Sequence, residues 1–192
     1  MLPYTPLHLL LLAEHGSALV ATSANRSGEP ICTSFDEVRR RLNEIVDVVL
    51  DHDRPIRRPV EDSVVQSVRG EIQVLRYARG FAPNVVARTS SSRDLLAAGG
   101  HLKSAVAVAT DGKIVLGPHV GDLEAPESIE AYEEAFADLP SLHEVRPTLV
   151  VHDAHPDYRS TCVAEDSGRP MMSVQHHAAH VASAVAAHDL PL

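Results

Sequence analysis

Two histidines near the carboxyl end of the sequence have the spacing of metal ligands. His176 and His180 lie four residues apart in SVQHHAAHVASAV, the segment from Ser173 to Val185. In a helix, residues i and i+4 share a face, so both imidazoles would point the same way. Imidazole nitrogens suit Zn²⁺ or Fe²⁺. A short helix that merely carries histidines explains the same spacing, because the chain has 12 of them.

The segment TSANRSGEPICT, from Thr22 to Thr33, is a second candidate for ligand binding. Its small residues would let backbone amides approach a phosphate or acyl group, and Ser23, Asn25 and Thr33 add hydrogen-bonding side chains. An ordinary turn after a strand has a similar composition, and the residues alone favour that simpler interpretation.

Arginines and a glycine pair offer further groups that could bind phosphate. Arg76 lies in LRYARGFAP, and three more arginines lie in HDRPIRRPVEDSV, where nearby carboxylates offer surface ion pairs as the alternative. Gly99 and Gly100 precede a predicted β-hairpin that carries Lys103, one of only two lysines. A plain loop is the commoner explanation of two consecutive glycines.

The elements that must position these residues alternate between helix and strand, which predicts an α/β fold with mixed sheets. The Asp-Gly pair between AVAVAT and KIVLG predicts a hairpin. The leucine-rich stretch from Leu7 to Ala13 predicts a buried amphipathic helix. The expected helices are 3–15, 35–42, 126–138, 157–165 and a last one reaching 188, and the other expected strands are 17–22, 46–50, 64–68, 72–75, 147–151 and 170–174.

Composition limits the classes of protein that fit. The chain has 192 residues, 44% of them hydrophobic, and no apolar run of about 18 residues, which predicts a globular protein without a membrane span. Cys32 and Cys162 are far apart, which favours a cytoplasmic protein and packing roles for both. Residues 1–86 hold 10 Lys/Arg and 11 Asp/Glu, whereas residues 87–192 hold 7 and 15. This shift predicts two units and argues against unspecific nucleic-acid binding.

Eight segments, taken together and in order, resemble the HypF family of hydrogenase-maturation carbamoyltransferases. They are MLPYTPLHLLL, TSANRSGEPICT, HDRPIRRPVEDSVV, LRYARGFAP, GGHLKSAVAVA, HVGDLEAPESIEAYEEA, DAHPDYRST and VQHHAAHVAS, and they cover nearly the whole chain. The resemblance implies that residues 1–84 are the C-terminal part of a YrdC-like domain. Residues 85–92 would be a linker, and residues 93–192 the N-terminal part of an actin-like (ASKHA) carbamoyltransferase domain.

The resemblance also implies an activity. Such enzymes form carbamoyl adenylate from carbamoyl phosphate and ATP, then transfer the carbamoyl group to the C-terminal cysteine thiolate of a HypE-like maturation protein. The product leads to the cyanide ligand of nickel–iron hydrogenase. Implied cofactors are Mg²⁺ and a divalent metal, zinc or iron. By motif, the implied sites are Ser23, Asn25, Thr33, Ser63 and Arg76 for nucleotide and acyl substrate, Gly99, Gly100 and Lys103 for phosphate, and His176 and His180 for metal.

Departures from the family pattern leave open whether the chain is an enzyme by itself. Pro59 stands where the family often has arginine, Ser104-Ala105 where it has Asn-Thr, and Ala178 where it has a third histidine. Because parts of both domains lie outside the resemblance, we expect an isolated chain that is inactive and self-associating. The alternatives are a subunit of a split enzyme and a non-enzymatic YrdC-like module that binds double-stranded RNA, to which the near-neutral first half lends little support.

Overall fold

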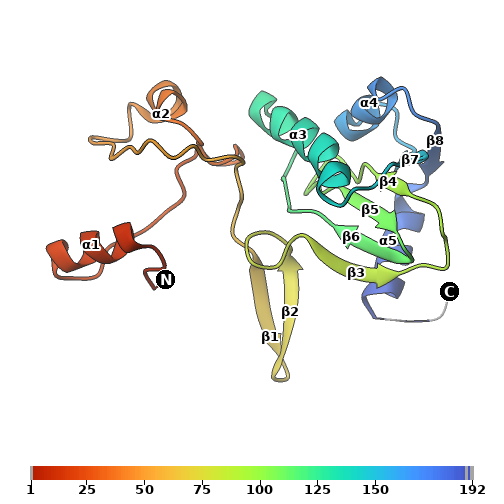
Figure 1. The fold of residues 1–192 in the computed structure, drawn as a ribbon, viewed down its shortest axis with the longest axis horizontal. Coiled ribbons are helices and arrows are strands. Elements are labelled where there is room, and N and C mark those ends of the chain that lie inside the picture. Colours follow the sequence, from red (N-terminus) through yellow and green to blue (C-terminus); the bar gives the residue numbers. More distant parts are fainter. Residues whose placement is uncertain (1, 189, 191–192) are drawn as a thin grey trace.

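The computed structural model describes residues 2–188 and 190, and it divides into a loop-rich N-terminal segment and a C-terminal sheet covered by helices (Figure 1). The N-terminal segment holds helices α1 (Pro6–His15) and α2 (Phe35–Leu42), joined by long loops. A separate two-stranded antiparallel sheet follows, made of β1 (Val64–Val68) and β2 (Glu71–Arg76). Among the described residues, no helix is both long enough and apolar enough to cross a membrane.

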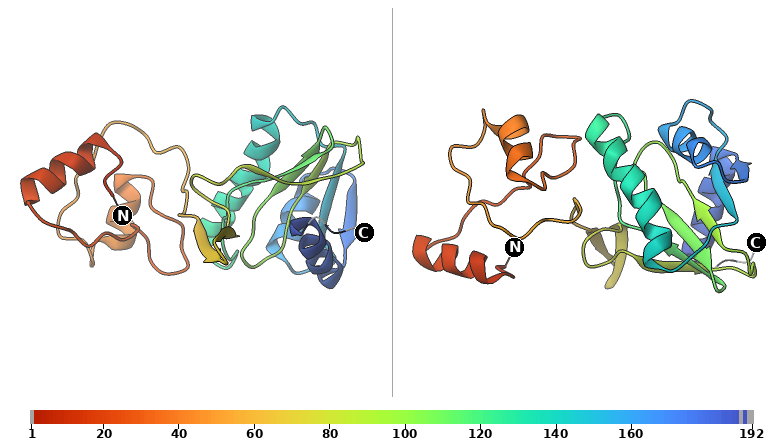
Figure 2. Two further views of the ribbon diagram at one scale, coloured as in Figure 1. Left: turned by 90° about the horizontal axis from the view of Figure 1, so that it is seen from below. Right: turned by 45° about the horizontal axis from the view of Figure 1, so that its top comes forward.

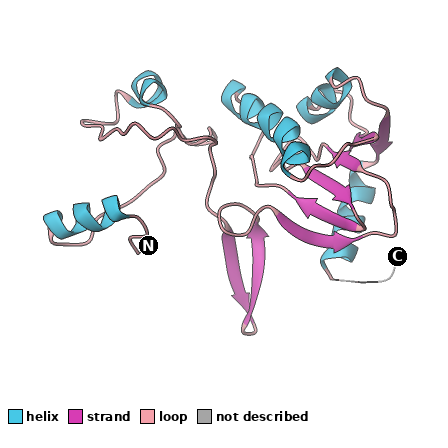
Figure 3. Ribbon diagram, in the orientation of Figure 1, coloured by secondary structure: helices cyan, strands magenta, loops and turns pink. Residues whose placement is uncertain are grey.

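Six strands form the main sheet, in the order β3-β6-β5-β4-β7-β8. Figure 3 shows strands in magenta, with the two-stranded hairpin standing apart from the larger sheet. β3, β6, β5 and β4 pair antiparallel, whereas β7 runs parallel to β4 and β8 parallel to β7. The strands are β3 (Asn84–Arg88), β4 (Leu95–Ala97), β5 (Ala107–Thr110), β6 (Lys113–Leu116), β7 (Leu149–Asp153) and β8 (Met171–Val174).

Three helices cover the main sheet. α3 (Pro126–Leu142) and α4 (Arg159–Asp166) lie on one face, and α5 (His176–Ala187) lies on the other (Figures 1 and 2). α3 connects β6 to β7. α4 connects β7 to its parallel neighbour β8, and so forms the long crossover connection that paired parallel strands require. As a result, α5 begins just beyond the carboxyl ends of the parallel strands β7 and β8.

The hydrophobic core lies between this sheet and α3. Leu96, Val108 and Val150 project from the strands, and Tyr132 and Phe136 from the helix. The Tyr132 hydroxyl donates a 2.6 Å hydrogen bond to the Ala98 carbonyl, so its polar end is satisfied inside the core. Burial also raises the pKa of Tyr132 well above its usual range, which keeps the hydroxyl protonated as a donor.

The predicted α/β class with mixed sheets is confirmed, and so are several elements. α2 has the predicted bounds, because Ser34 caps it and its first turn carries Asp36 and Glu37. Both predicted hairpins form, and the Asp111-Gly112 turn takes the positive φ values, 49° and 71°, that a tight hairpin turn needs. These features depend on neighbours in the sequence, which is why the sequence predicted them.

The expected strands and the buried helix of the N-terminal half are wrong, and part of the predicted linker is a strand. Residues 17–22 and 46–50 form no strand, because no other described segment pairs with them. Residues 85–88 of the predicted linker 85–92 lie in β3, which is held by antiparallel pairing to β6. The predicted buried leucine helix is α1, but it has no buried residue, and Leu10 is 69% exposed.

Candidate functional site

His176 and His180 converge on one side of α5. Their Nε2 atoms lie 3.1 Å apart and their rings stand nearly perpendicular, at 77°. Two nitrogens each about 2.0–2.1 Å from one zinc ion are separated by roughly 3 Å, so the pair fits as two ligands of a single metal. His177 lies one residue further along, about 100° around the helix. The structure thus places the two predicted ligands as the spacing required.

Asp153, the last residue of β7, contacts His176 on the Nδ1 side of its ring, away from His180. Its Oδ2 lies 2.6 Å from His176 Nδ1, and its Oδ1 accepts a 2.9 Å hydrogen bond from the His155 backbone N–H. Burial by itself would raise the pKa of Asp153, but the hydrogen bonds from His176 and His155 outweigh burial and lower that pKa. The carboxylate is therefore ionised, and it orients the ring of His176.

A stack of rings adjoins this pair. Tyr158 lies between His155, 4.1 Å away between ring centres, and His101, 5.3 Å away, and its ring meets that of His176 edge-on at 6.2 Å. Neither Asp153 nor these three rings was predicted from the sequence. A signal was available: HDAHPDY begins at the end of a parallel strand, the edge where α/β sheets bind ligands.

The fit to a metal is partial. Within residues 2–188, no three His, Cys, Asp or Glu side chains are grouped closely enough to hold one metal ion. Asp153 is engaged with the Nδ1 side of His176, away from the convergent Nε2 atoms. The described residues therefore supply two convergent imidazole nitrogens and one carboxylate that orients the ring of His176.

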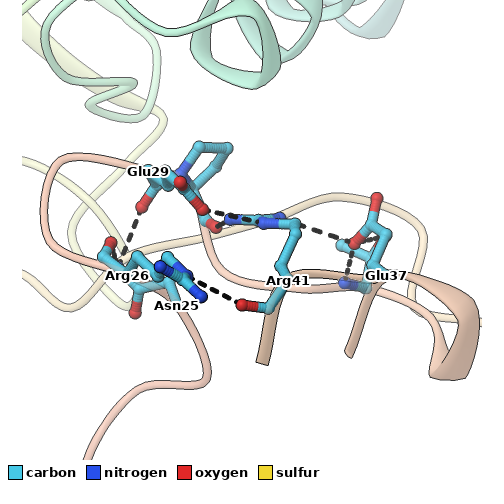
Figure 4. A network of polar contacts seen from close by, with 7 residues as sticks. Asn25, Arg26, Glu29, Glu37 and Arg41 are labelled. Carbon is cyan, nitrogen blue, oxygen red and sulfur yellow. Dashed lines mark hydrogen bonds and ion pairs between the residues drawn. The ribbon is translucent and has the colours of Figure 1, made fainter. Parts of the chain in front are cut away.

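The predicted acyl and nucleotide loop, 22–33, is shaped by its own polar side chains (Figure 4). The Asn25 amide donates to the Glu29 carbonyl at 2.8 Å, and the Cys32 N–H donates to the Ala24 carbonyl at 2.8 Å. Arg41, a buried residue of α2, donates its Nε–H to the Glu29 carboxylate at 2.9 Å. A buried arginine thus fixes the loop against α2, a contact that was not predicted from the sequence.

Three predicted residues of this loop differ in what they have free for a ligand. Asn25 Oδ1 is buried and has no hydrogen-bond partner among the described residues. Thr33 lines a cavity with residues 49–56, while its N–H donates to the Glu37 carboxylate at 2.6 Å. Ser23 is exposed. Among the described residues, the loop therefore offers one acceptor without a partner, and beside the cavity the Thr33 hydroxyl, which also donates to the Glu37 carboxylate at 3.4 Å.

Ser63 and Arg76 both lie in the region of the β1–β2 hairpin. Ser63 Oγ accepts from the Ala78 N–H at 2.8 Å and donates to the Arg79 carbonyl at 3.0 Å, which ties the two ends of the hairpin together. Arg76 forms a 2.6 Å ion pair with Glu61. The geometry assigns Ser63 a structural role and leaves Arg76 partly neutralised.

Arg76 and Lys103 line one cavity, although the sequence placed them in different units. Tyr77 and His119 line it as well, and the His119 N–H donates to the Tyr77 carbonyl at 2.8 Å. Burial and then the charge of Arg76 lower the pKa of His119. This cavity, called the junction cavity below, joins two predicted phosphate-binding groups and does not include Thr33.

Gly99 and Gly100 differ in how strictly the fold requires glycine. Gly99 has φ +71°, and a Cβ there would lie only 2.4 Å from the Ala105 carbonyl oxygen. A Cβ at Gly100 would meet nothing closer than 3.9 Å. Lys103 has φ 50°, and its N–H donates to Asp122 Oδ1 at 2.7 Å. The turn that presents Lys103 is therefore tightly built around Gly99.

Two family models match the chain. The model described as the HypF Kae1-like domain matches residues 90–187, and the Sua5/YciO/YrdC model, described as telomere recombination, matches residues 1–78. Among curated relatives, carbamoyltransferase HypF of Synechocystis sp. is 44% identical over 99% of this chain. HypF of Rhizobium leguminosarum bv. viciae is 41% identical over 97% of this chain. The aligned region is 25% of each relative, so the chain spans about a quarter of their length.

Two solved structures of HypF proteins are also similar to this chain. A full-length HypF in a phosphate- and nucleotide-bound form superposes with a TM-score of 0.84 and 34% identity, covering 100% of this chain and 31% of that one. HypF from T. kodakarensis gives a TM-score of 0.77 and 31% identity, covering 88% of this chain and 23% of that one.

Proposed function

The chain belongs to the HypF carbamoyltransferase family, and from that premise we propose that it supplies part of both active centres of a hydrogenase-maturation carbamoyltransferase. One centre forms carbamoyl adenylate from carbamoyl phosphate and ATP, and the other transfers the carbamoyl group. The observation that carries the proposal is 44% identity to a HypF over 99% of the chain. Because the chain spans a quarter of such enzymes, the complete reaction needs the rest of a HypF-length protein.

On the nucleotide side, ATP and the acyl substrate are bound by four residues: Thr33, Asn25, Arg76 and the exposed Ser23. Mg²⁺ accompanies the phosphates of ATP. Asn25 Oδ1, which has no hydrogen-bond partner in the described part of the chain, and the position of Thr33 beside a cavity support this assignment. Arg76 contributes positive charge toward phosphate in the junction cavity. Ser63 belongs to this side through its motif, and it acts by holding the hairpin that carries Arg76.

On the transfer side, His176 and His180 hold a zinc or iron ion, and Gly99, Gly100 and Lys103 face a phosphate. A bound divalent metal would supply Lewis-acid polarisation and orientation of the carbamoyl group. The convergent Nε2 atoms support the metal assignment, and the turn built around Gly99 supports the assignment of Lys103. The acceptor is the C-terminal cysteine thiolate of a HypE-like partner.

Two free cysteines, Cys32 and Cys162, support a reducing, cytoplasmic location.

A chimera tests the nucleotide side. This chain replaces the aligned quarter of the Synechocystis enzyme, and carbamoyl-phosphate-dependent ATP–pyrophosphate exchange is measured. We expect exchange, and at least a tenfold loss in Arg76→Ala, because removing one phosphate-binding charge costs about 1.5–3 kcal/mol. Arg93→Ala, which changes an exposed arginine outside the sites, serves as the control and keeps its activity. A folded chimera without exchange would overturn this half of the proposal.

A further inference from the structure

Asp153 occupies a fixed position between the main sheet and the start of α5. It pairs in register with Val174, the last residue of β8, and α5 begins two residues later at His176. Its side chain is only 8% exposed. Its backbone carbonyl accepts a 3.2 Å hydrogen bond from the buried Thr161 hydroxyl of α4. The position of the Asp153 carboxylate is therefore set by the sheet, by α4 and by α5 together.

Both oxygens of the carboxylate are engaged. Oδ2 meets His176 Nδ1 at 2.6 Å, and Oδ1 accepts the His155 N–H at 2.9 Å. An ionised carboxylate can only accept, so His176 must carry its proton on Nδ1. A neutral imidazole has one N–H, which leaves the lone pair on Nε2. That atom is the one that faces His180 Nε2, 3.1 Å away.

We propose that Asp153 is a positioning residue that fixes the tautomer and ring orientation of His176, so that the Nε2 lone pair faces the metal site. This inference rests on the proposed function, because that function makes His176 and His180 metal ligands. Carboxylates that accept the second N–H of a metal-binding imidazole also raise its basicity, and losing them costs about 10–100-fold in metal affinity.

The first test compares zinc affinities of the full chain, measured by competition with a chelating dye. In Asp153→Asn, the single amide oxygen cannot serve both the His155 and the His176 N–H donors. We expect zinc binding at least about tenfold weaker than in the wild type. The matched control is Asp157→Asn, at an exposed carboxylate in the turn that follows β7, which loses the same charge and keeps wild-type affinity. A melting temperature close to the wild-type value shows that Asp153→Asn is folded.

The outcomes separate the inference from the proposed function. If the wild type binds zinc no better than His176→Ala/His180→Ala, the proposed metal site fails. If the wild type binds zinc and Asp153→Asn binds it equally well, the positioning role is overturned while the metal site stands. The second readout needs no variant: ¹⁵N imidazole shifts of the metal-free wild type must show His176 protonated on Nδ1. Protonation on Nε2 would overturn the inference whatever the zinc affinities are.

Discussion

At the scale of single residues, the groups beside the junction cavity show how charge and burial act on one imidazole. His119 is half-buried, and Arg76 and Lys103 disfavour its protonation, whereas Glu61 and Asp122 favour it. Burial and Arg76 prevail, so the pKa of His119 lies below the usual value of 6.5. A histidine that stays neutral in the folded state must gain a proton when the chain unfolds in mild acid.

This arrangement predicts a loss of stability at low pH. With a folded pKa below the unfolded one, the unfolded state binds more protons, so stability rises with pH between the two values and falls as pH drops below about 6.5. Urea melts of the wild type and of His119→Gln, between pH 5 and pH 7.5, measure how the free energy of unfolding changes with pH. The wild type should lose more stability toward pH 5 than His119→Gln, whereas His15→Gln, at an exposed histidine, should follow the wild type. Parallel pH profiles for the wild type and His119→Gln would contradict this account.

At the scale of elements, the turn between β4 and β5 constrains where Lys103 can lie. Gly99 combines a positive φ with a position at which an added Cβ would overlap the Ala105 carbonyl oxygen, so any Cβ must displace the backbone. Gly100, its neighbour in the same motif, has neither restriction. The fold alone thus explains one glycine of the pair and leaves the other free for contact with a ligand.

The two glycines therefore respond differently to the same substitution. Gly99→Ala should destabilise the chain by at least about 1–3 kcal/mol, the usual cost of a strained backbone conformation. Gly100→Ala should change stability by less than about 0.5 kcal/mol. Denaturant melts of both variants measure the difference. Equal stability of the two variants would show that the turn is not as tight as described.

How far the sequence predicts each element depends on the distance between the interacting residues. α2 and the hairpins were predicted because capping and turn residues act locally, as Ser34 and the Asp111-Gly112 pair do. β3 was missed because its partner β6 lies some 25 residues on, and the serines after it suggested a linker. The His176–His180 pair was predicted from helical spacing. Its contact with Asp153 depends on the register of β7 with β8, which the sequence does not display.

At the scale of the whole molecule, the two halves differ in how much they bury. The core cluster comes entirely from residues 96–164, whereas in the described residues before β1 only Cys32, Arg41 and Leu42 are buried. Large apolar side chains of α1 face solvent, including Leu9 at 56% and Leu10 at 69% exposed. Exposed apolar surface of this kind favours association with another polypeptide.

The chain should therefore self-associate through its N-terminal segment. Light scattering coupled to gel filtration should show mass rising with protein concentration, because burying these leucines stabilises the associated state. Leu9→Gln/Leu10→Gln should shift the equilibrium toward monomer, whereas Leu142→Gln, an equally exposed leucine on α3, should not. A concentration-independent monomer that melts cooperatively would contradict this prediction.

The central claim is that this chain serves a HypF-type carbamoyl transfer, and one measurement tests it most directly. The chimera with the Synechocystis enzyme is incubated with radiolabelled carbamoyl phosphate, ATP and a HypE-like protein, and label on the C-terminal cysteine is counted. We predict label in the wild-type chimera and at least tenfold less in His176→Ala/His180→Ala, with His177→Ala as the control that retains labelling. A folded chimera that leaves the cysteine unlabelled, or labels it equally without the histidine pair, would contradict the account.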